Sequence, residues 1–211
     1  MDYVLFGIQG SGKGTQGKIL AQHMGAAYFE TGGELRRLAG ENSELGQKVK
    51  GIIEAGHLVP NEVVMEIVEN FLANKITASA DAVIFDGIPR NEEQNKSLTY
   101  LLKKLGRDFT GIYFELARGE AERRLLARRL CGKCKTVYAA AFKGATCEKC
   151  GSALATRADD NTASIRTRID IFYKETMPII ESWRAAGIVI SVNAAGTIDE
   201  VTKELLAKID G

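Results

Sequence analysis

The sequence lacks the features that mark several whole classes of protein. Its 28 Lys and Arg residues nearly equal its 27 Asp and Glu residues, and this net charge of +1 argues against a protein that coats nucleic acid. No apolar run approaches the roughly 20 residues of a membrane-spanning helix. The start, Met1-Asp2-Tyr3-Val4, carries an acid where a signal peptide carries Lys or Arg, so we expect a cytoplasmic protein without nucleic-acid or membrane partners.

Histidine is scarce as well. His23 and His57 are the only two, and neither lies near a Ser, a Cys or a carboxylate pair in a pattern that suggests acid–base catalysis. The rest is ordinary globular composition: 45% of the 211 residues are apolar and 26% are charged, which excludes a mainly disordered chain. The length favours one α/β domain with insertions.

Short apolar runs alternate with longer stretches of helical periodicity, which is typical of a parallel sheet covered by helices. Pro178 should kink the last long helix or mark its late turns, because proline has no N–H group to donate. The predicted strands are 3–6, 27–29, 82–86, 111–116 and 188–192. The predicted helices are 13–24, 32–39, 43–55, 61–75, 91–105, 119–130, 161–184 and 198–209.

A glycine-rich loop, 7–15, joins the first strand to the first helix. Its spacing matches G-x-x-x-x-G-K, except that Gly14 follows Lys13 where Ser or Thr is usual and Thr15 comes one position later. Glycines let several backbone N–H groups converge on an anion, and the helix start adds its positive end. Lys13 can reach the terminal phosphates of a nucleotide, and Thr15 can serve a phosphate or a metal. The loop therefore predicts nucleotide binding.

All four cysteines fall in one segment of low helical periodicity, 131–154. They form C-x₂-C, twelve residues, and C-x₂-C again, from Cys131 and Cys134 to Cys147 and Cys150. This spacing predicts a structural zinc site with four thiolate ligands, which would fold a segment too small for its own core. Two disulfides are the alternative, and iron or cobalt could replace zinc with the same ligands.

The loop in its G-x-x-G-x-G-K-G-T form resembles that of nucleoside monophosphate kinases, and of adenylate kinases in particular. Further resemblances follow in the family's order, ending with an insert that is similar to the zinc-bearing long lid of many bacterial adenylate kinases. They lie at 31–36 (TGGELR), 56–59, 86–90 with Gln94 (DGIPR, then Q), Arg124 with 128–129, and 156–160 with Arg168.

This resemblance implies an α/β P-loop three-layer fold with a five-stranded parallel sheet, an acceptor-binding helical insert and a zinc lid. It implies a core made of residues 1–30, 60–126 and 161–211, a monophosphate-binding insert at 31–59 and a lid at 127–160. The implied activity is Mg²⁺-dependent interconversion of ATP plus AMP with two ADP, for nucleotide homeostasis and salvage, by a monomer.

Phosphoryl transfer requires charge neutralisation, in-line positioning and exclusion of water more than covalent help from protein. The resemblance implies Lys13, Arg90, Arg124, Arg128, Arg157 and Arg168 as the catalytic cations, with Asp86 holding Mg²⁺ mostly through water. The implied ATP site is Gly10, Ser11, Gly12, Lys13, Gly14, Thr15, Arg124, Arg128, Val137, Tyr138 and Gly196. The implied AMP site is Thr31, Arg36, His57, Leu58, Val59, Gly87, Ile88, Pro89, Arg90, Gln94, Arg157 and Arg168.

The sequence departs from the family pattern at three positions: Gln9 replaces a usual proline, Gly33 a usual aspartate and Ile88 a common phenylalanine. The glycine at position 33 argues against a metal-binding role there. Other readings stay open. They are a kinase for UMP, CMP or GMP, a P-loop hydrolase, and a nucleotide switch whose cysteine insert binds nucleic acid. We expect Arg129 to be a solvated surface charge and Trp183 to pack in the core.

Overall fold

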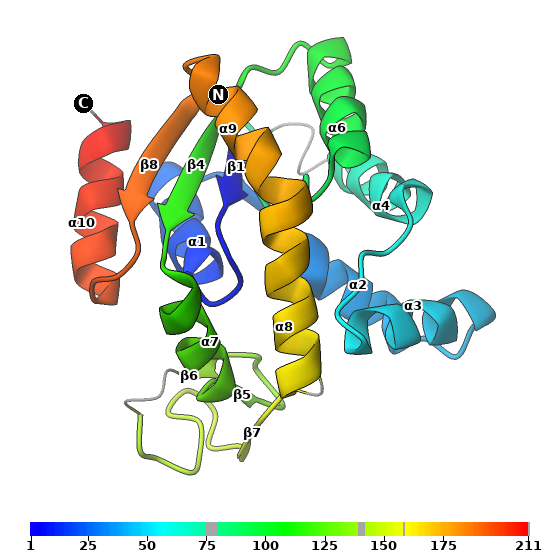
Figure 1. Cartoon of the computed structure of the whole chain (residues 1–211), viewed down its shortest axis with the longest axis vertical. Helices are drawn as coiled ribbons and strands as arrows, with labels where there is room; N and C mark the ends of the chain where they lie inside the picture. The colour runs from blue at the N-terminus through cyan, green and yellow to red at the C-terminus, as the bar shows by residue number, and fades with distance from the viewer. Residues whose placement is uncertain (75–79, 139–141, 158, 211) are drawn as a thin grey trace.

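The structure is a computed structural model that describes residues 1–74, 80–138, 142–157 and 159–210. Its centre is a five-stranded sheet in which all neighbouring strands run parallel, in the order β2-β3-β1-β4-β8 (Figure 1). This confirms the predicted fold class. The strands are β1 (Asp2–Phe6), β2 (Ala27–Glu30), β3 (Val83–Asp86), β4 (Phe109–Glu115) and β8 (Val189–Asn193).

Helices cover both faces of the sheet, as the alternating pattern predicts (Figure 1). On one face α1 packs against α10, and on the other α9 crosses β4 and β8. Helices α2 and α3 branch away between β2 and β3. The helices are α1 (Lys13–Met24), α2 (Thr31–Ala39), α3 (Glu44–Glu54), α4 (Asn61–Ala73), α6 (Glu92–Lys104), α7 (Arg118–Leu126), α8 (Thr162–Ile171), α9 (Met177–Ala185) and α10 (Ile198–Ile209). The predicted end of α4 at Lys75 lies outside the described residues.

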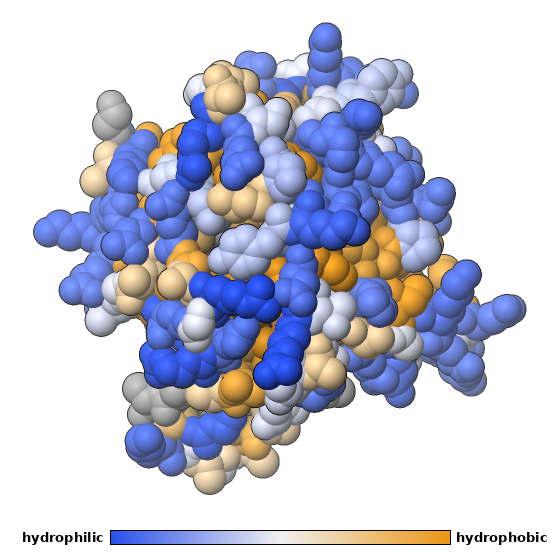
Figure 2. Space-filling view, viewed as in Figure 1, coloured by the Kyte–Doolittle hydropathy of each residue, from blue (hydrophilic) through white to orange (hydrophobic). Residues whose placement is uncertain are grey.

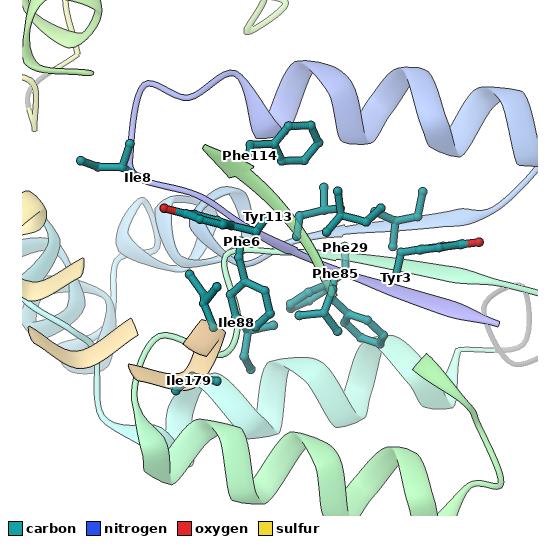
Figure 3. Close-up of a cluster of buried hydrophobic side chains, with 14 of the residues drawn as sticks. Tyr3, Phe6, Ile8, Phe29, Phe85, Ile88, Tyr113, Phe114 and Ile179 are labelled. Carbon is teal, nitrogen blue, oxygen red and sulfur yellow. The ribbon is translucent and has the colours of Figure 1, made fainter. Parts of the chain in front are cut away.

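The core is one continuous cluster on the two faces of the sheet. Figure 3 shows Phe114 on the side of α1, and Phe6, Ile88 and Ile179 on the opposite side. Trp183 is 5% exposed, and its ring packs edge-on against Phe6 at 5.1 Å between ring centroids. Its prediction as a core residue is confirmed.

The predicted helix 161–184 is interrupted. Between α8 and α9 the residues Phe172–Thr176 form a turn of π-helix, and Pro178 is the second residue of α9. Proline has no N–H to donate and its ring clashes with the carbonyl four residues earlier, here Lys174. The wider π turn accommodates both constraints without ending the helix.

The helix predicted at 119–130 ends earlier, at Leu126, and that prediction is wrong in its last turn. Arg129–Cys131 instead forms β5, the middle strand of a small antiparallel sheet with β6 (Val137–Tyr138) and β7 (Leu154–Ala155). Pairing with two distant segments outweighs the local helical pattern here. This sheet and the cysteines form the projection below α7 and α8 in Figure 1, which we call the lid. Within the described ranges, no helix is long and apolar enough to cross a membrane.

Candidate active site and metal centre

The glycine-rich loop has a backbone that only glycine adopts readily. Gly10 and Gly12 have φ angles of 90° and 86°, in the left-handed region. A Cβ on Gly10 would lie 2.9 Å from the carbonyl oxygen of Ala121, so α7 packs directly on the loop. α1 then begins at Lys13 without a side-chain cap, which leaves its first N–H groups for an anion.

The charged and polar side chains of the loop are also suited to binding an anion. The Ser11 hydroxyl is buried and has no partner among the described residues. Burial lowers the pKa of Lys13, Asp86 opposes this shift, and the positive charges of Arg90 and Arg128 add to it. The three cations therefore repel one another across the site. A bound polyphosphate would offset both this repulsion and the cost of burying their charges.

Asp86 ends β3 beside this loop and is 6% exposed. A Cβ on Gly14 would lie only 3.1 Å from its Oδ2 atom, so the carboxylate lies against the loop. Tyr28 donates a hydrogen bond to the same Oδ2 at 2.8 Å. Oxygen ligands suit Mg²⁺, and a buried carboxylate beside a phosphate loop, with the exposed Thr15 one residue after Gly14, fits a magnesium–nucleotide.

A second group of predicted residues surrounds a cavity of about 30 Å³ between α2, α4 and the end of β3. Gln94 accepts a hydrogen bond from the backbone N–H of Arg90 at 2.9 Å, and Arg90 Nε donates to the Gly87 carbonyl at 2.9 Å. The Thr31 hydroxyl is buried and has no partner among the described residues. The predicted acceptor residues that line this cavity are Thr31, His57, Leu58, Val59, Gly87, Arg90 and Gln94.

A neighbouring cavity of about 20 Å³ joins this group to the glycine-rich loop. Lys13 and Gln9 line it from the loop, Gly87 and Arg90 line it from the acceptor side, and Gly87 and Arg90 also line the first cavity. Burial, together with the charges of Arg168 and Arg36, lowers the pKa of Arg90 against the opposing effect of Asp86. The predicted donor and acceptor sites therefore meet at Arg90.

Arg36 lies at the edge of this region and is held by Glu30. Its Nη2 atom is 2.8 Å from Glu30 Oε1, and Glu30 also forms an ion pair with Lys18 at 3.4 Å. Burial would raise the pKa of Glu30, but the charges of Lys18 and Arg36 leave it lowered. Of the remaining acceptor predictions, Ile88 and Pro89 are buried, and Pro89 lines the smaller cavity.

Two aspartates hold three of the predicted arginines at the entrance to α8. Asp159 binds Arg157 through both oxygens, at 3.1 and 3.0 Å, and Asp160 contacts both Arg128 and Arg168. Burial and the repulsion of Arg128 and Arg36 lower the pKa of Arg157 to about 10. The space-filling view shows strongly hydrophilic side chains over α7 and α8 on this face (Figure 2).

Arg124 lies apart from this network. Its guanidinium binds Glu120 at 2.7 Å and donates to the carbonyl oxygens of Ala194 and Ala195 at 3.0 and 3.1 Å. It therefore ties α7 to the loop that follows β8. The predicted Gly196 lies in that loop and is exposed.

The four cysteine sulfurs lie within 4.8 Å of one another in the lid. The Cys131–Cys150 and Cys134–Cys147 sulfurs are each 3.4 Å apart, and all four thiols are free, so the disulfide alternative is not what the structure contains. A tetrahedral zinc ion with ~2.3 Å bonds needs sulfurs about 3.8 Å apart, so the cluster fits zinc.

The predicted nucleotide contacts of the lid differ in exposure. Tyr138 is 7% exposed, packs on Phe142 at 4.4 Å, and donates a hydrogen bond to the Cys147 sulfur at 3.2 Å. Its ring therefore faces the inside of the lid, whereas the side chain of Val137 is half exposed. Arg129 is not the free surface charge that we expected, because it donates to the carbonyls of Gly144 and Phe142 within the lid.

Sequence reasoning missed Tyr28 and Glu30. Both lie on β2, two residues apart, and Glu30 is the register partner of Asp86 on the neighbouring strand. Because side chains two apart on a strand share a face, alternation along 27–30 could have placed them on one face of the sheet, but not beside Asp86. No motif pointed to either residue.

Comparisons with known proteins show the family of the chain. The family model for adenylate kinase matches residues 5–188. A protein named adenylate kinase from Citrifermentans bemidjiense is 35% identical over 99% of both chains, and one from Kosmotoga olearia is 34% identical over 100% of this chain and 99% of its own. One from Methanocella arvoryzae is 31% identical over 99% of this chain and 98% of its own. The chain, a phosphotransferase by this likeness, belongs to the adenylate kinase family.

Proposed function

We propose that the protein catalyses Mg²⁺-dependent transfer of the terminal phosphoryl group of ATP to AMP, forming two ADP, and the reverse reaction. The observation that carries this proposal is the pair of adjoining cavities, which share Gly87 and Arg90, with Lys13 of the phosphate loop lining the smaller of the two. A donor phosphate on the loop and an acceptor phosphate beside Arg90 would then approach each other end to end.

The transfer forms a bond between an AMP phosphate oxygen and the γ-phosphorus of ATP while the bond to the β–γ bridging oxygen breaks. The acceptor phosphate is already ionised at pH 7, so no protein base is needed. Lys13 and Arg90, which both line the smaller cavity, would stabilise the charge on the moving group. Their partial desolvation strengthens that interaction.

Donor binding is assigned to the loop from Gly10 to Thr15, with Arg124, Arg128, Val137 and the backbone at Gly196 around the base. Asp86 would accept hydrogen bonds from the water molecules around the Mg²⁺ that accompanies ATP. This ion would neutralise part of the phosphate charge. Arg36, Arg157 and Arg168 would join the acceptor phosphate. For this, each would exchange an aspartate or glutamate partner for the ligand.

The lid, within 127–160, would close over the donor and exclude water, which limits hydrolysis of ATP. Zinc on the four cysteines would hold its folded shape, since the lid has only a small cluster of buried residues. The insert 31–59 would carry the acceptor, and the remaining three segments would form the core. We further propose a cytoplasmic monomer that serves nucleotide homeostasis.

The deciding test is incubation of the purified protein with ADP and Mg²⁺ alone, followed by separation of nucleotides. We expect equal amounts of ATP and AMP, none of either with EDTA, and at least about a hundredfold slower formation of both with Lys13→Ala. Release of phosphate with AMP but no ATP would instead support a hydrolase. Rates with AMP, UMP, CMP and GMP as acceptors test the base, and a preference for any of the last three would overturn the AMP assignment.

A further inference from the structure

Tyr28 joins β2 to the candidate magnesium carboxylate. Its hydroxyl donates to Asp86 Oδ2 at 2.8 Å and lies 3.4 Å from the carbonyl oxygen of Gly14 in the phosphate loop. The shorter contact is a hydrogen bond to a charged acceptor, the stronger class of hydrogen bond. A single phenol thus touches both the loop and the carboxylate.

Two glycines on one face of α1 make room for this arrangement. A Cβ on Gly17 would lie 2.8 Å from the Tyr28 ring and 2.5 Å from Leu5 Cδ1, and a Cβ on Gly14 would lie 3.1 Å from Asp86 Oδ2. Glycine inside a helix costs about 1 kcal/mol relative to alanine. The two glycines of α1 lie at the positions where a side chain would push the helix away from Tyr28 and Asp86.

The same contact leaves the second carboxylate oxygen available. Within the described part of the chain, Asp86 Oδ1 accepts no hydrogen bond. The carboxylate is therefore fixed through one oxygen and open at the other.

We propose that Tyr28 is a positioning residue of the phosphoryl-transfer site, which fixes the Asp86 carboxylate for the metal that accompanies the donor nucleotide. This inference rests on the function proposed above for Asp86. It goes beyond that function because it assigns a metal-dependent role to a residue on β2 that lies in no nucleotide-binding motif. A purely structural Tyr28 would fill space against Gly17 and would influence metal-bound and metal-free nucleotide equally.

The experiment is calorimetric binding of a non-hydrolysable ATP analogue to the full chain, with and without Mg²⁺. The variants are Tyr28→Phe, which keeps the ring, Asp86→Asn, and both together. Tyr100→Phe, on an exposed side chain of α6, is the matched control. We expect Tyr28→Phe to reduce the Mg²⁺-dependent gain in affinity about tenfold, the typical effect of one hydrogen bond to a charged group. Its metal-free affinity should equal that of the control.

The double variant should be no weaker than Asp86→Asn alone, because Tyr28 acts through Asp86. A normal Mg²⁺ gain in Tyr28→Phe, with the gain lost in Asp86→Asn, would overturn the role of Tyr28 and leave the proposed function intact. Equal losses with and without Mg²⁺, or additive losses in the double variant, would also overturn it. If Asp86→Asn kept the normal Mg²⁺-dependent gain in affinity, Asp86 would have no role in holding the metal. The proposed role of Tyr28 would then fall as well.

Discussion

Arg128 and Asp160 form a two-point ion pair, with Arg128 Nε 2.8 Å from Oδ2 and Nη2 2.6 Å from Oδ1. Arg128 follows α7 and Asp160 precedes α8, so this pair connects the two ends of the chain segment that includes the lid. Arg168 binds the same Asp160 Oδ1 at 2.9 Å. One buried carboxylate therefore anchors two arginines that we assign to the reaction.

Removing that carboxylate should destabilise the protein and change how its stability depends on pH. Burial would raise the pKa of Asp160, but its bonds to Arg128 and Arg168 leave it lowered. Because the pKa of Asp160 is lower in the folded than in the unfolded protein, its ionised form stabilises the folded state at pH values above about 3.9, the pKa of an unfolded aspartate. This stabilisation is lost as the pH falls through the pKa of the folded state. We expect Asp160→Asn to cost roughly 3–5 kcal/mol at pH 7.

Urea unfolding between pH 7 and pH 3, followed by Trp183 fluorescence, measures this effect on the core rather than the lid. The cost of Asp160→Asn should shrink as the pH falls below 4. Asp81→Asn, on an exposed residue, serves as the control. A cost that stays constant across this range would contradict the ionic explanation.

Lys13→Ala should lower kcat by about two to three orders of magnitude, because it removes a charge from the phosphate loop. The melting temperature should change little, since burial already lowers the pKa of Lys13 and no ion pair within 4 Å holds it among the described residues. Lys103→Ala, on the exposed face of α6, is the matched charge removal. A variant at position 13 with near-normal turnover would exclude the assigned role.

Arg90→Ala should impair use of the acceptor more than use of the donor, because Arg90 lines the larger cavity together with Gln94 and the other predicted acceptor residues. Loss of a hydrogen bond to a charged group costs roughly 1.5–3 kcal/mol, or about 10- to 100-fold in KM for AMP. Steady-state kinetics with each nucleotide varied in turn measure the split. Equal effects on both substrates would point to a general loss of structure, which circular dichroism can detect.

Cys147→Ser should lower the zinc content below one ion per chain and loosen the lid. Hydrogen exchange should speed up in 129–138 and 147–157 and stay unchanged in β1 and β3, because the lid has its own small core. Tyr138→Phe removes the donor to the Cys147 sulfur and should speed loss of the metal to a chelator. Uniform acceleration across the chain, or an unchanged lid after chelation, would contradict a structural metal confined to the lid.

Strong local signals explain what the sequence predicts correctly. The spacing of the cysteines predicts the cluster in which their sulfurs lie within 4.8 Å of one another, whereas the roles of Lys13 and Asp86 stay predictions. All five core strands are confirmed within a few residues, because buried parallel strands form continuous apolar runs.

The lid strands were missed for the opposite reason. β6 and β7 have two residues each, too few for any periodicity, and they form only because β5 pairs with both. The contacts of Tyr28 with Asp86, and of Arg128 with Asp160, join residues 58 and 32 positions apart. No local pattern encodes such pairs.

The π turn at Phe172–Thr176 also determines which way the side chains of α9 face relative to those of α8. Upstream, α8 directs Ser164 at the Glu54 carbonyl and Arg168 at Asp159 and Asp160, and downstream α9 directs Ile179, Ile180 and Trp183 at the sheet. One extra residue in a helix rotates all that follows by about 100°. Thr176, at the end of the turn, donates to the Arg90 carbonyl at 2.7 Å. A single irregular turn thus lets one continuous helical segment present Arg168 to Asp159 and Asp160 at one end and pack three large apolar side chains into the hydrophobic core at the other.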